Sequence, residues 1–266
     1  MKRPAHILPV IVLAQLVGTS VWFAGNAVLP DLEAGWGIDN GVVWVTVATQ
    51  VGFILGTLGS AFSGLADRVS PSRLFLISAV LAGLFNAVPM LWPESFGMVI
   101  AARLLVGVAL AGIYPIGMKV AAGWFDGGLG GALGWLVGAL VVGTALPHGI
   151  RALGADLPWQ SVIGGTSLLC VAGGILLVVA VPDGPHLAKS APFDVRAPLR
   201  LIRDPALRSA ALGYLGHMWE LYTFWALIPV ILATSVVAGT TLSGGVSAWS
   251  FATIAIGGVT CALGGM

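Results

Sequence analysis

Eight apolar stretches, each long enough to cross a lipid bilayer as a helix, follow one another along this chain. A helix needs about 20 apolar residues to span the hydrocarbon core. Short connections join most neighbouring stretches, as in a bundle of antiparallel helices. By residue number, the predicted spans are 7–30, 42–64, 74–92, 96–118, 129–147, 161–181, 209–234 and 243–263. The sequence therefore predicts an all-α membrane protein, a helical bundle with about eight transmembrane helices.

The composition excludes a soluble domain. Hydrophobic residues make up 58% of the chain and charged residues only 9%, whereas a globular domain carries about 25% charged residues. The net charge is +1 and no basic run is present, so we expect no nucleic-acid partner. The two cysteines, Cys170 and Cys261, fall within spans and are predicted to be buried apolar residues.

The basic residues sort to one face of the predicted bundle. Arg151 lies on the opposite face and Arg103 lies inside a span. Because Lys and Arg near span ends are retained in the cytoplasm, this bias predicts a multi-pass protein with a cytoplasmic N-terminus. The basic residues on the cytoplasmic face are Lys2, Arg3, Arg68, Arg73, Lys119, Lys189, Arg196, Arg200, Arg203 and Arg208.

The stretch 182–208 differs from the other connections because it holds five prolines and five basic residues. Its prolines argue against one continuous helix, so we expect a cytoplasmic linker. The predicted organisation is a six-helix half at 1–181, this linker at 182–208, and a second unit at 209–266 that starts and then stops. The chain ends at Gly264-Gly265-Met266 without a polar tail, which indicates a truncation inside or just after the eighth span.

Polar side chains inside spans are costly and mark candidate sites. In the first span four of them follow a 4-3-4 spacing, which places them on one helical face. These four are Gln15, Thr19, Trp22 and Asn26. In the fourth span, Arg103, Gly107 and Tyr114 share a face, and in the seventh span Tyr214, His217, Leu221 and Phe224 do, with Glu220 to one side. We expect the polar members to line a shared interior path.

Arg103 and Glu220 lie at similar depths. At 1.5 Å of rise per residue, Arg103 lies about 10 Å below one surface and Glu220 about 16 Å above the other. In a core of about 30 Å, these depths differ by about 4 Å, which suggests an ion pair. A role in solute or proton handling is one reading for Arg103, and bonding to carbonyls of neighbouring helices is the other. His217 is either a packing residue or a proton or solute contact.

Small residues recur at every fourth position in the second and fifth spans, a pattern that allows close helix packing in membranes. The two stripes consist of Gly52, Gly56, Ser60 and Gly64, and of Gly130, Gly134 and Gly138. Tight contact alone explains them, and sliding during a conformational cycle is the functional alternative.

No enzyme motif is present. His217-Met-Trp-Glu220 resembles half of an inverted zinc motif, but Leu221 stands where the second histidine belongs. The Gly-rich stretch 127–134 opens a transmembrane helix rather than a nucleotide-binding unit. We therefore expect no enzymatic activity, no cofactor and no metal site; a membrane enzyme would need a nucleophile–base pair or a metal.

The connection between the second and third spans, Gly64-Leu-Ala-Asp67-Arg68-Val-Ser-Pro-Ser-Arg73, resembles the signature loop of the major facilitator superfamily, Gly-x-Leu-Ala-Asp-Arg-x-Gly-Arg-Arg. Aligned on the acid, Leu65, Ala66, Asp67 and Arg68 match, while Ser63, Ser70, Pro71 and Ser72 depart and Arg73 comes one step late. Arg103-Leu-Leu-Val-Gly107 resembles the family's Arg-x-x-x-Gly pattern in the fourth helix. Other stretches are similar to a poorly characterised bacterial branch.

This resemblance implies twelve helices in two halves, with solute bound between them and access that alternates by rocking. It implies that helices one, four and seven line the path and that helices two, five, eight and eleven form the interface. Asp67, Arg68 and Arg73 would form a conformational loop in which Asp67 meets the eleventh helix, and helices nine to twelve are missing here. The expected function is proton-coupled secondary transport of a small solute across the bacterial inner membrane.

We expect the residues of the predicted solute path to have different roles. Arg103 would hold an anionic group or tune a carboxyl, and Glu220 and His217 would titrate. Arg103 and His217 favour a solute with a carboxylate, an organic anion. The remaining path residues are Gln15, Thr19, Trp22, Asn26 and Tyr114. The rival interpretation is a truncated membrane protein that does not transport, either a fragment or a scaffold.

Overall fold

A computed structural model of the chain describes residues 4–37, 40–154, 156–187, 202–237, 239 and 241–265. Within these residues every regular element is a helix. In chain order they are α1 (Ile7–Thr19), α2 (Ala24–Ala27), α3 (Leu29–Trp36), α4 (Gly41–Ser63), α5 (Leu65–Arg68), α6 (Pro71–Ala87), the 3₁₀ helix η1 (Val88–Met90), α7 (Phe96–Leu110), α8 (Tyr114–Trp124), α9 (Leu129–Leu153), α10 (Gln160–Ala180), α12 (Pro205–Val237) and α13 (Gly245–Gly264).

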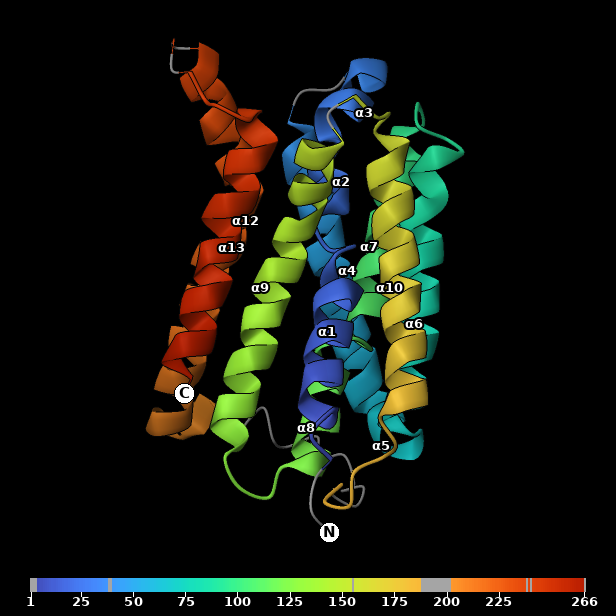
Figure 1. Ribbon diagram of the computed structural model, residues 1–266, viewed down its shortest axis with the longest axis vertical. Helices are drawn as coiled ribbons and strands as arrows, with labels where there is room; N and C mark the ends of the chain where they lie inside the picture. The colour runs from blue at the N-terminus through green and yellow to red at the C-terminus, as the bar shows by residue number, and fades with distance from the viewer. Residues whose placement is uncertain are drawn as a thin grey trace.

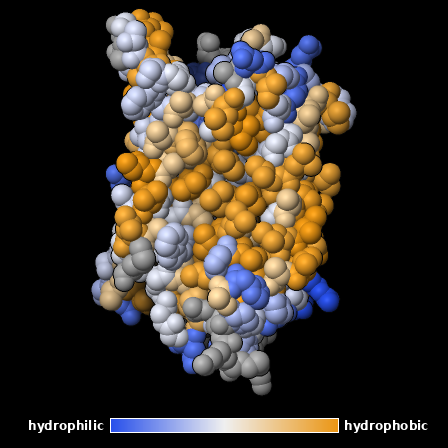
Figure 2. Space-filling model, in the orientation of Figure 1, coloured by the Kyte–Doolittle hydropathy of each residue, from blue (hydrophilic) through white to orange (hydrophobic). Residues whose placement is uncertain are grey.

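Seven helical stretches in the described residues have the length and composition to cross a membrane, and α1 is a shorter apolar helix. Figure 2 shows apolar side chains over the middle of the visible face and hydrophilic ones towards its two ends. The prediction of an all-α membrane bundle is confirmed. The fifth span runs to Leu153, beyond its predicted end at Pro147, because α9 continues through that proline. The seventh begins at Pro205, four residues before the predicted start.

The long helices stand side by side, with the N-terminus at one end of the bundle (Figure 1). Helix α4 packs on α7, α6 packs on α10, and α1 packs between α9 and α10. The opposite side of α9 carries α13, which in turn contacts α12. Helix α9 therefore lies between α1 and α13, while α12 also contacts α4 of the first six spans. The predicted linker at 182–208 lies largely outside the described residues, so the division into halves stays a prediction.

Glycines allow two of these contacts. A side chain at Gly52 or Gly107 would collide with the backbone of the facing helix, so α4 and α7 touch backbone to backbone. On α9, a Cβ atom at Gly138 would lie 2.6 Å from the carbonyl oxygen of Gly258 in α13. The stripe of the fifth span thus faces the second unit, as the family resemblance implies. The stripe of the second span faces α7 instead, within the first unit.

The first span is broken, which the sequence analysis did not predict. Helix α1 ends at Thr19, and α2 begins at Ala24 after a turn at residues 20–23. The fourth span also bends, between α7 and α8, at residues 111–113. There a side chain on Gly112 would collide with the hydroxyl of Ser78, so α6 lies directly against the bend. Both breaks leave backbone groups that neighbouring residues must satisfy.

The segment 182–187 after α10, here called the strap, folds back across the ends of α6 and α8. Backbone atoms of Gly184 in the strap and Gly123 in α8 are in direct contact. Its hydrogen bonds are Ser70 Oγ to Asp183 Oδ1 (2.9 Å), Trp124 Nε1 to Pro182 O (3.0 Å) and His186 N to Gly123 O (2.9 Å). The strap ties the end of α10 to the rest of the first unit.

Candidate functional site

Arg103 is buried at the centre of the first unit, with 1% of its surface exposed. Its Nη2 donates to the carbonyl oxygens of Val21 (2.9 Å) and Trp22 (2.6 Å) at the break in the first span. Its Nη1 donates to Asn86 Oδ1 (2.9 Å) on α6, and its Nε donates to Thr49 Oγ1 (3.3 Å) on α4. The guanidinium group therefore joins three neighbouring spans from its place on α7.

Asn86 extends this polar network to the sixth span. Its Nδ2 lies 3.1 Å from Thr166 Oγ1, 3.0 Å from Ser167 Oγ and 3.3 Å from Ile163 O, all on α10. Ser20, in the break, lies 3.4 Å from the Thr166 carbonyl oxygen. The network crosses five spans, and its charge is enclosed among protein acceptors.

The predicted Arg103–Glu220 pair is not formed. Every hydrogen-bond partner of Arg103 belongs to the first unit. Glu220 and His217 are exposed on α12, and in the described part of the chain neither has an ion-pair partner. Arg103 and Glu220 do not meet at their similar depths, because the rise along a helix fixes the height of a side chain but not the direction in which it points. Arg103 shares the side of α7 that Gly107 turns towards α4.

The four polar residues of the first span are buried, but they do not form one stripe. Gln15 contacts Gly117 on α8, and Thr19 contacts Gly143 on α9. Trp22 packs on Phe53 of α4, and Asn26 donates to Thr46 Oγ1 of α4 at 2.9 Å. The break at residues 20–23 rotates the later residues relative to the earlier ones. These side chains consequently face three different helices.

An aromatic cluster joins the break to α12. The ring of Trp22 lies 4.9 Å from that of Phe53 and 5.6 Å from that of Tyr222, centroid to centroid. Trp225 makes edge contacts with Phe23 (5.9 Å) and Tyr222 (5.4 Å). Tyr114, at the start of α8, is half-buried against the same hydrophobic core.

The buried side of α12 overlaps the face predicted for it. On this helix only Trp225, Ala226 and Ile228 are fully buried, and Tyr214 and Phe224 are exposed. With about 3.6 residues per turn, Trp225 and Ile228 lie on the same side of α12 as Tyr214 and Leu221, and Leu221 packs against the hydrophobic core.

Five side chains have buried polar atoms without a hydrogen-bond partner in the described residues: both amide atoms of Gln15, Nε1 of Trp22, Nε2 of Gln50 and of His148, and Oε1 of Gln160. An unpaired buried polar group costs about 1–3 kcal/mol, so such groups are candidates for contact with a solute or water. His148, on α9, was missed because the predicted fifth span ended one residue before it. Its signal was a histidine one turn after Thr144 on the same helix.

The loop motif has a different partner from the one implied by the resemblance. Asp67 forms an ion pair with Lys119 of α8, and the Lys119 Nζ also donates to the carbonyl oxygen of Ala66 at 2.6 Å. Arg68 and Arg73 are exposed and have no ion pair with any described residue. The motif therefore ties the second-to-third connection to the end of the fourth span.

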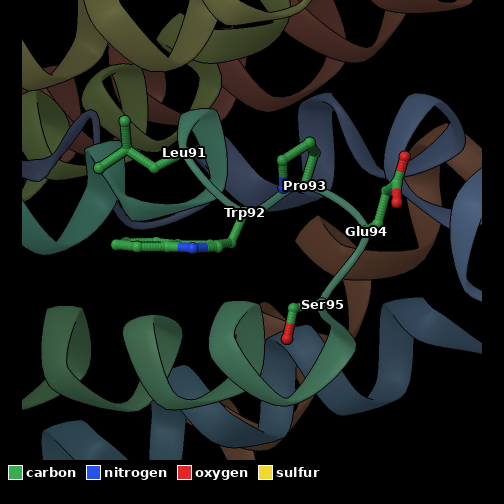
Figure 3. Close-up of a pocket in the computed structure, with 5 residues that line it drawn as sticks. All are labelled: Leu91, Trp92, Pro93, Glu94 and Ser95. Atoms are coloured by element: carbon green, nitrogen blue, oxygen red, sulfur yellow. The ribbon is translucent and has the colours of Figure 1, made fainter.

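The surface hollows lie elsewhere. One, of about 520 Å³, is lined by the consecutive residues Leu91 to Ser95, and its only carboxyl, on Glu94, points away from the Trp92 ring (Figure 3). The other is an apolar groove of about 180 Å³ between α1, α9 and α13. None of the predicted path residues lines either hollow. Among the described residues, no group of His, Cys, Asp or Glu side chains could hold a metal ion.

Comparison with known proteins identifies the family to which the chain belongs. No curated protein matches the sequence. The structure of the proton:xylose symporter XylE, of the major facilitator superfamily, bound to 6-bromo-6-deoxy-D-glucose is similar in fold, with a TM-score of 0.57 and 14% sequence identity. The match covers 67% of this chain and 45% of the symporter, so it spans less than half of that protein. The family model described as Major Facilitator Superfamily matches residues 11–266. The chain belongs to the major facilitator superfamily.

Proposed function

We propose that the protein is a secondary active transporter that moves a small solute by alternating access. The observation that carries the proposal is the aromatic junction between the broken first span and α12. Broken helices and polar groups near the middle of the membrane accompany solute sites in transporters. The family membership and the fold shared with a proton:xylose symporter support the same assignment.

The proposed path follows the junction. Trp22 and Tyr114 lie on the first unit, while His217 and Glu220 lie on the exposed side of α12. We propose that Glu220 and His217 exchange protons with the solute path, which would couple transport to a proton gradient. Gln15, Thr19 and Asn26 are buried against α8, α9 and α4, and we propose that they contact solute or water only when the units separate. Asp67, Arg68 and Arg73 keep their proposed role in the conformational loop.

The hydrogen bonds that Arg103 already makes disfavour an anionic solute. Four of the five guanidinium N–H groups already donate to protein acceptors, so an organic anion would find a single free donor unless it displaced a protein oxygen. A neutral, planar solute matches the aromatic rings and the free N–H of Trp22 better. The neighbouring symporter carries xylose according to its title, which places a neutral sugar in the test panel.

Proteoliposomes test the proposal. The chain would be reconstituted with an imposed inward proton gradient, and uptake of radiolabelled xylose, lactate and benzyl alcohol would be compared. We expect saturable uptake of at least one solute, collapse of that uptake by a protonophore, and loss of most uptake in Trp22→Ala. Trp249→Ala is the matched control, because Trp249 is half-exposed on α13 and outside the cluster.

The result that would contradict transport is uptake equal to that of protein-free vesicles for every solute. A non-transporting scaffold would then be the better assignment. Uptake that is unaffected by the protonophore would support transport but contradict coupling to protons.

We also propose that the protein lies in a bacterial inner membrane with its N-terminus in the cytoplasm. Helices α5, which holds Arg68, and α8, which holds Lys119, lie at the end of the bundle that holds the N-terminus, and Arg73 is in the first turn of α6. Arg151, near the end of α9, pairs with Asp31 of α3 at the other end. This asymmetry follows the positive-inside rule. An impermeant thiol reagent added to intact cells should label Asp156→Cys, on the α9–α10 connection, and leave Asp126→Cys, on the α8–α9 connection, unlabelled.

A further inference from the structure

We propose that Arg103 and Asn86 are positioning residues that lock the break in the first span and thereby set the place of Trp22 against α12. This inference concerns the folded chain and holds whether or not the protein transports a solute.

The break needs an external partner. No glycine or proline lies within residues 20–23, which read Ser-Val-Trp-Phe. The hydroxyls of Thr19 and Ser20 bond back to carbonyl groups of the preceding turn, which bends a helix but supplies no donor to Val21 or Trp22. The carbonyl groups of Val21 and Trp22 accept hydrogen bonds from Arg103, which lies about eighty residues further along the chain. In an apolar interior, unpaired carbonyl groups would favour a return to continuous helix. The guanidinium group therefore stabilises the broken form.

Asn86 holds the guanidinium group in place. It accepts from Nη1 of Arg103 and donates to α10, so it fixes Arg103 relative to the sixth span. A planar guanidinium can bond Asn86, Thr49 and two carbonyls at once, which the single ammonium of lysine cannot do. The α2 helix lies against the same side chain, because a Cβ atom at Gly25 would lie 3.2 Å from Arg103 Cδ.

Trp22 is the residue through which this lock reaches α12. Its carbonyl oxygen is bonded to Arg103, while its ring packs between Phe53 and Tyr222. The carbonyl group bonded to Arg103 and the packed ring belong to the same residue, so a shift of the Trp22 backbone also shifts its ring. A solute that took more than the one remaining guanidinium N–H of Arg103 would first have to break one of these bonds.

Fluorine NMR of the chain labelled with 5-fluorotryptophan provides a test that needs no solute. The chain has ten tryptophans, and the resonance lost in Trp22→Phe is assigned to Trp22. In Arg103→Met and Asn86→Leu we expect the Trp22 resonance to move or broaden while that of Trp249 stays in place. Arg151→Met is the matched control, since it removes an arginine with two hydrogen bonds to Asp31 outside the network.

A second readout uses the native cysteines. Cys170 is buried on α10, and its thiol donates to the carbonyl oxygens of Gly18 (3.3 Å) and Ala79 (3.5 Å), close to the network. Cys261, on α13, serves as the internal reference. In Arg103→Met we expect N-ethylmaleimide to label Cys170 at least about tenfold faster relative to Cys261, a factor that corresponds to about 1.4 kcal/mol.

The conservative variants separate positioning from general damage. Asn86→Asp keeps an acceptor for Arg103 and should leave the Trp22 resonance near its wild-type position, although it loses the donors to α10. Arg103→Lys should give an intermediate shift. If Arg103→Met fails to fold, as judged by its circular dichroism, Asn86→Leu and Asn86→Asp carry the test. The proposal is overturned if Asn86→Leu leaves both the Trp22 resonance and the Cys170 labelling ratio as they are in Arg151→Met.

Discussion

The first six spans and the last two use their polar residues in opposite ways. In the first unit, half of the most apolar stretch of α9 is buried, and Arg103, Asn86 and Thr49 bond to one another across spans. In α12 only 17% of the corresponding stretch is buried, and Glu220 and His217 lie exposed. A polar side chain within a span is therefore no site by itself. Its direction around the helix decides whether it joins spans or meets the surroundings.

The largest effect on stability is expected for Gly107→Ala, at the contact between α4 and α7. Its new Cβ would meet the backbone of Thr49, Phe53 and Gly52, so the two helices would have to separate. We expect a loss of about 3 kcal/mol in the free energy of unfolding, measured by titration of mixed micelles with dodecyl sulfate. Gly97→Ala on the same helix is the control, because nothing lies within 4 Å of its Cβ position. Equal stability of Gly107→Ala and wild type would refute the tight contact.

Gly138→Ala probes the boundary between the two regions. Its Cβ would lie 2.6 Å from the Gly258 carbonyl oxygen on α13. We expect α13 to loosen by about 2 kcal/mol, observed as faster maleimide labelling of Cys261 with unchanged labelling of Cys170. In Gly130→Ala, which meets nothing within 4 Å on the same helix, both labelling rates should remain those of wild type. A parallel rise at both cysteines in Gly138→Ala would show that the two regions unfold together.

A glycine-to-alanine substitution on α12 should raise the free energy of unfolding rather than lower it. No atom lies within 4 Å of the Cβ position of Gly216, so alanine meets no obstacle there. Alanine is favoured over glycine in a helix by about 1 kcal/mol, and we expect a gain of about 0.5–1 kcal/mol in the same titration. Gly213→Ala should behave alike. A clear loss in both variants would mean that this side of α12 is packed against something.

Lys119→Met should have the smallest effect. The pair with Asp67 is partly exposed, with 24% and 36% of the two side chains accessible. Partly exposed ion pairs contribute about 0–1 kcal/mol, and salt screens them. We therefore expect a loss below about 1 kcal/mol that shrinks in 0.5 M sodium chloride. A loss that is larger and independent of salt would indicate that the bond from Lys119 to the Ala66 carbonyl dominates.

The positions of the spans could be predicted from the sequence, because lipid imposes a minimum length and an apolar composition on each helix. Every predicted span overlaps at least one helix in the structure, and the first overlaps α1, α2 and the start of α3. The break at residues 20–23 could not be predicted, since the carbonyl groups freed there bond to Arg103 on another helix. Of the two readings left open for Arg103, the contacts favour bonding to carbonyls of neighbouring helices, and its solute role stays untested.

Directions around each helix were harder to predict than positions along it. Gln15 and Thr19 are buried, as are Trp225 and Ile228 on the predicted side of α12, whereas Glu220 and His217 lie on the exposed surface of that helix. The partner of Asp67 was also missed, because the resemblance pointed to a distant helix rather than to Lys119. Side-chain direction depends on contacts between distant segments, which a single sequence shows only where periodicity is strong.

The strap has a consequence for how the protein is made. A ribosome delivers the spans in order, and early segments fold before later ones emerge. Once residues 182–187 have settled on the ends of α6 and α8, the first six spans have all their mutual contacts. Helix α13 then enters the membrane beside α9, and α12 beside α4 and the broken first span, so both helices meet a surface that is already formed.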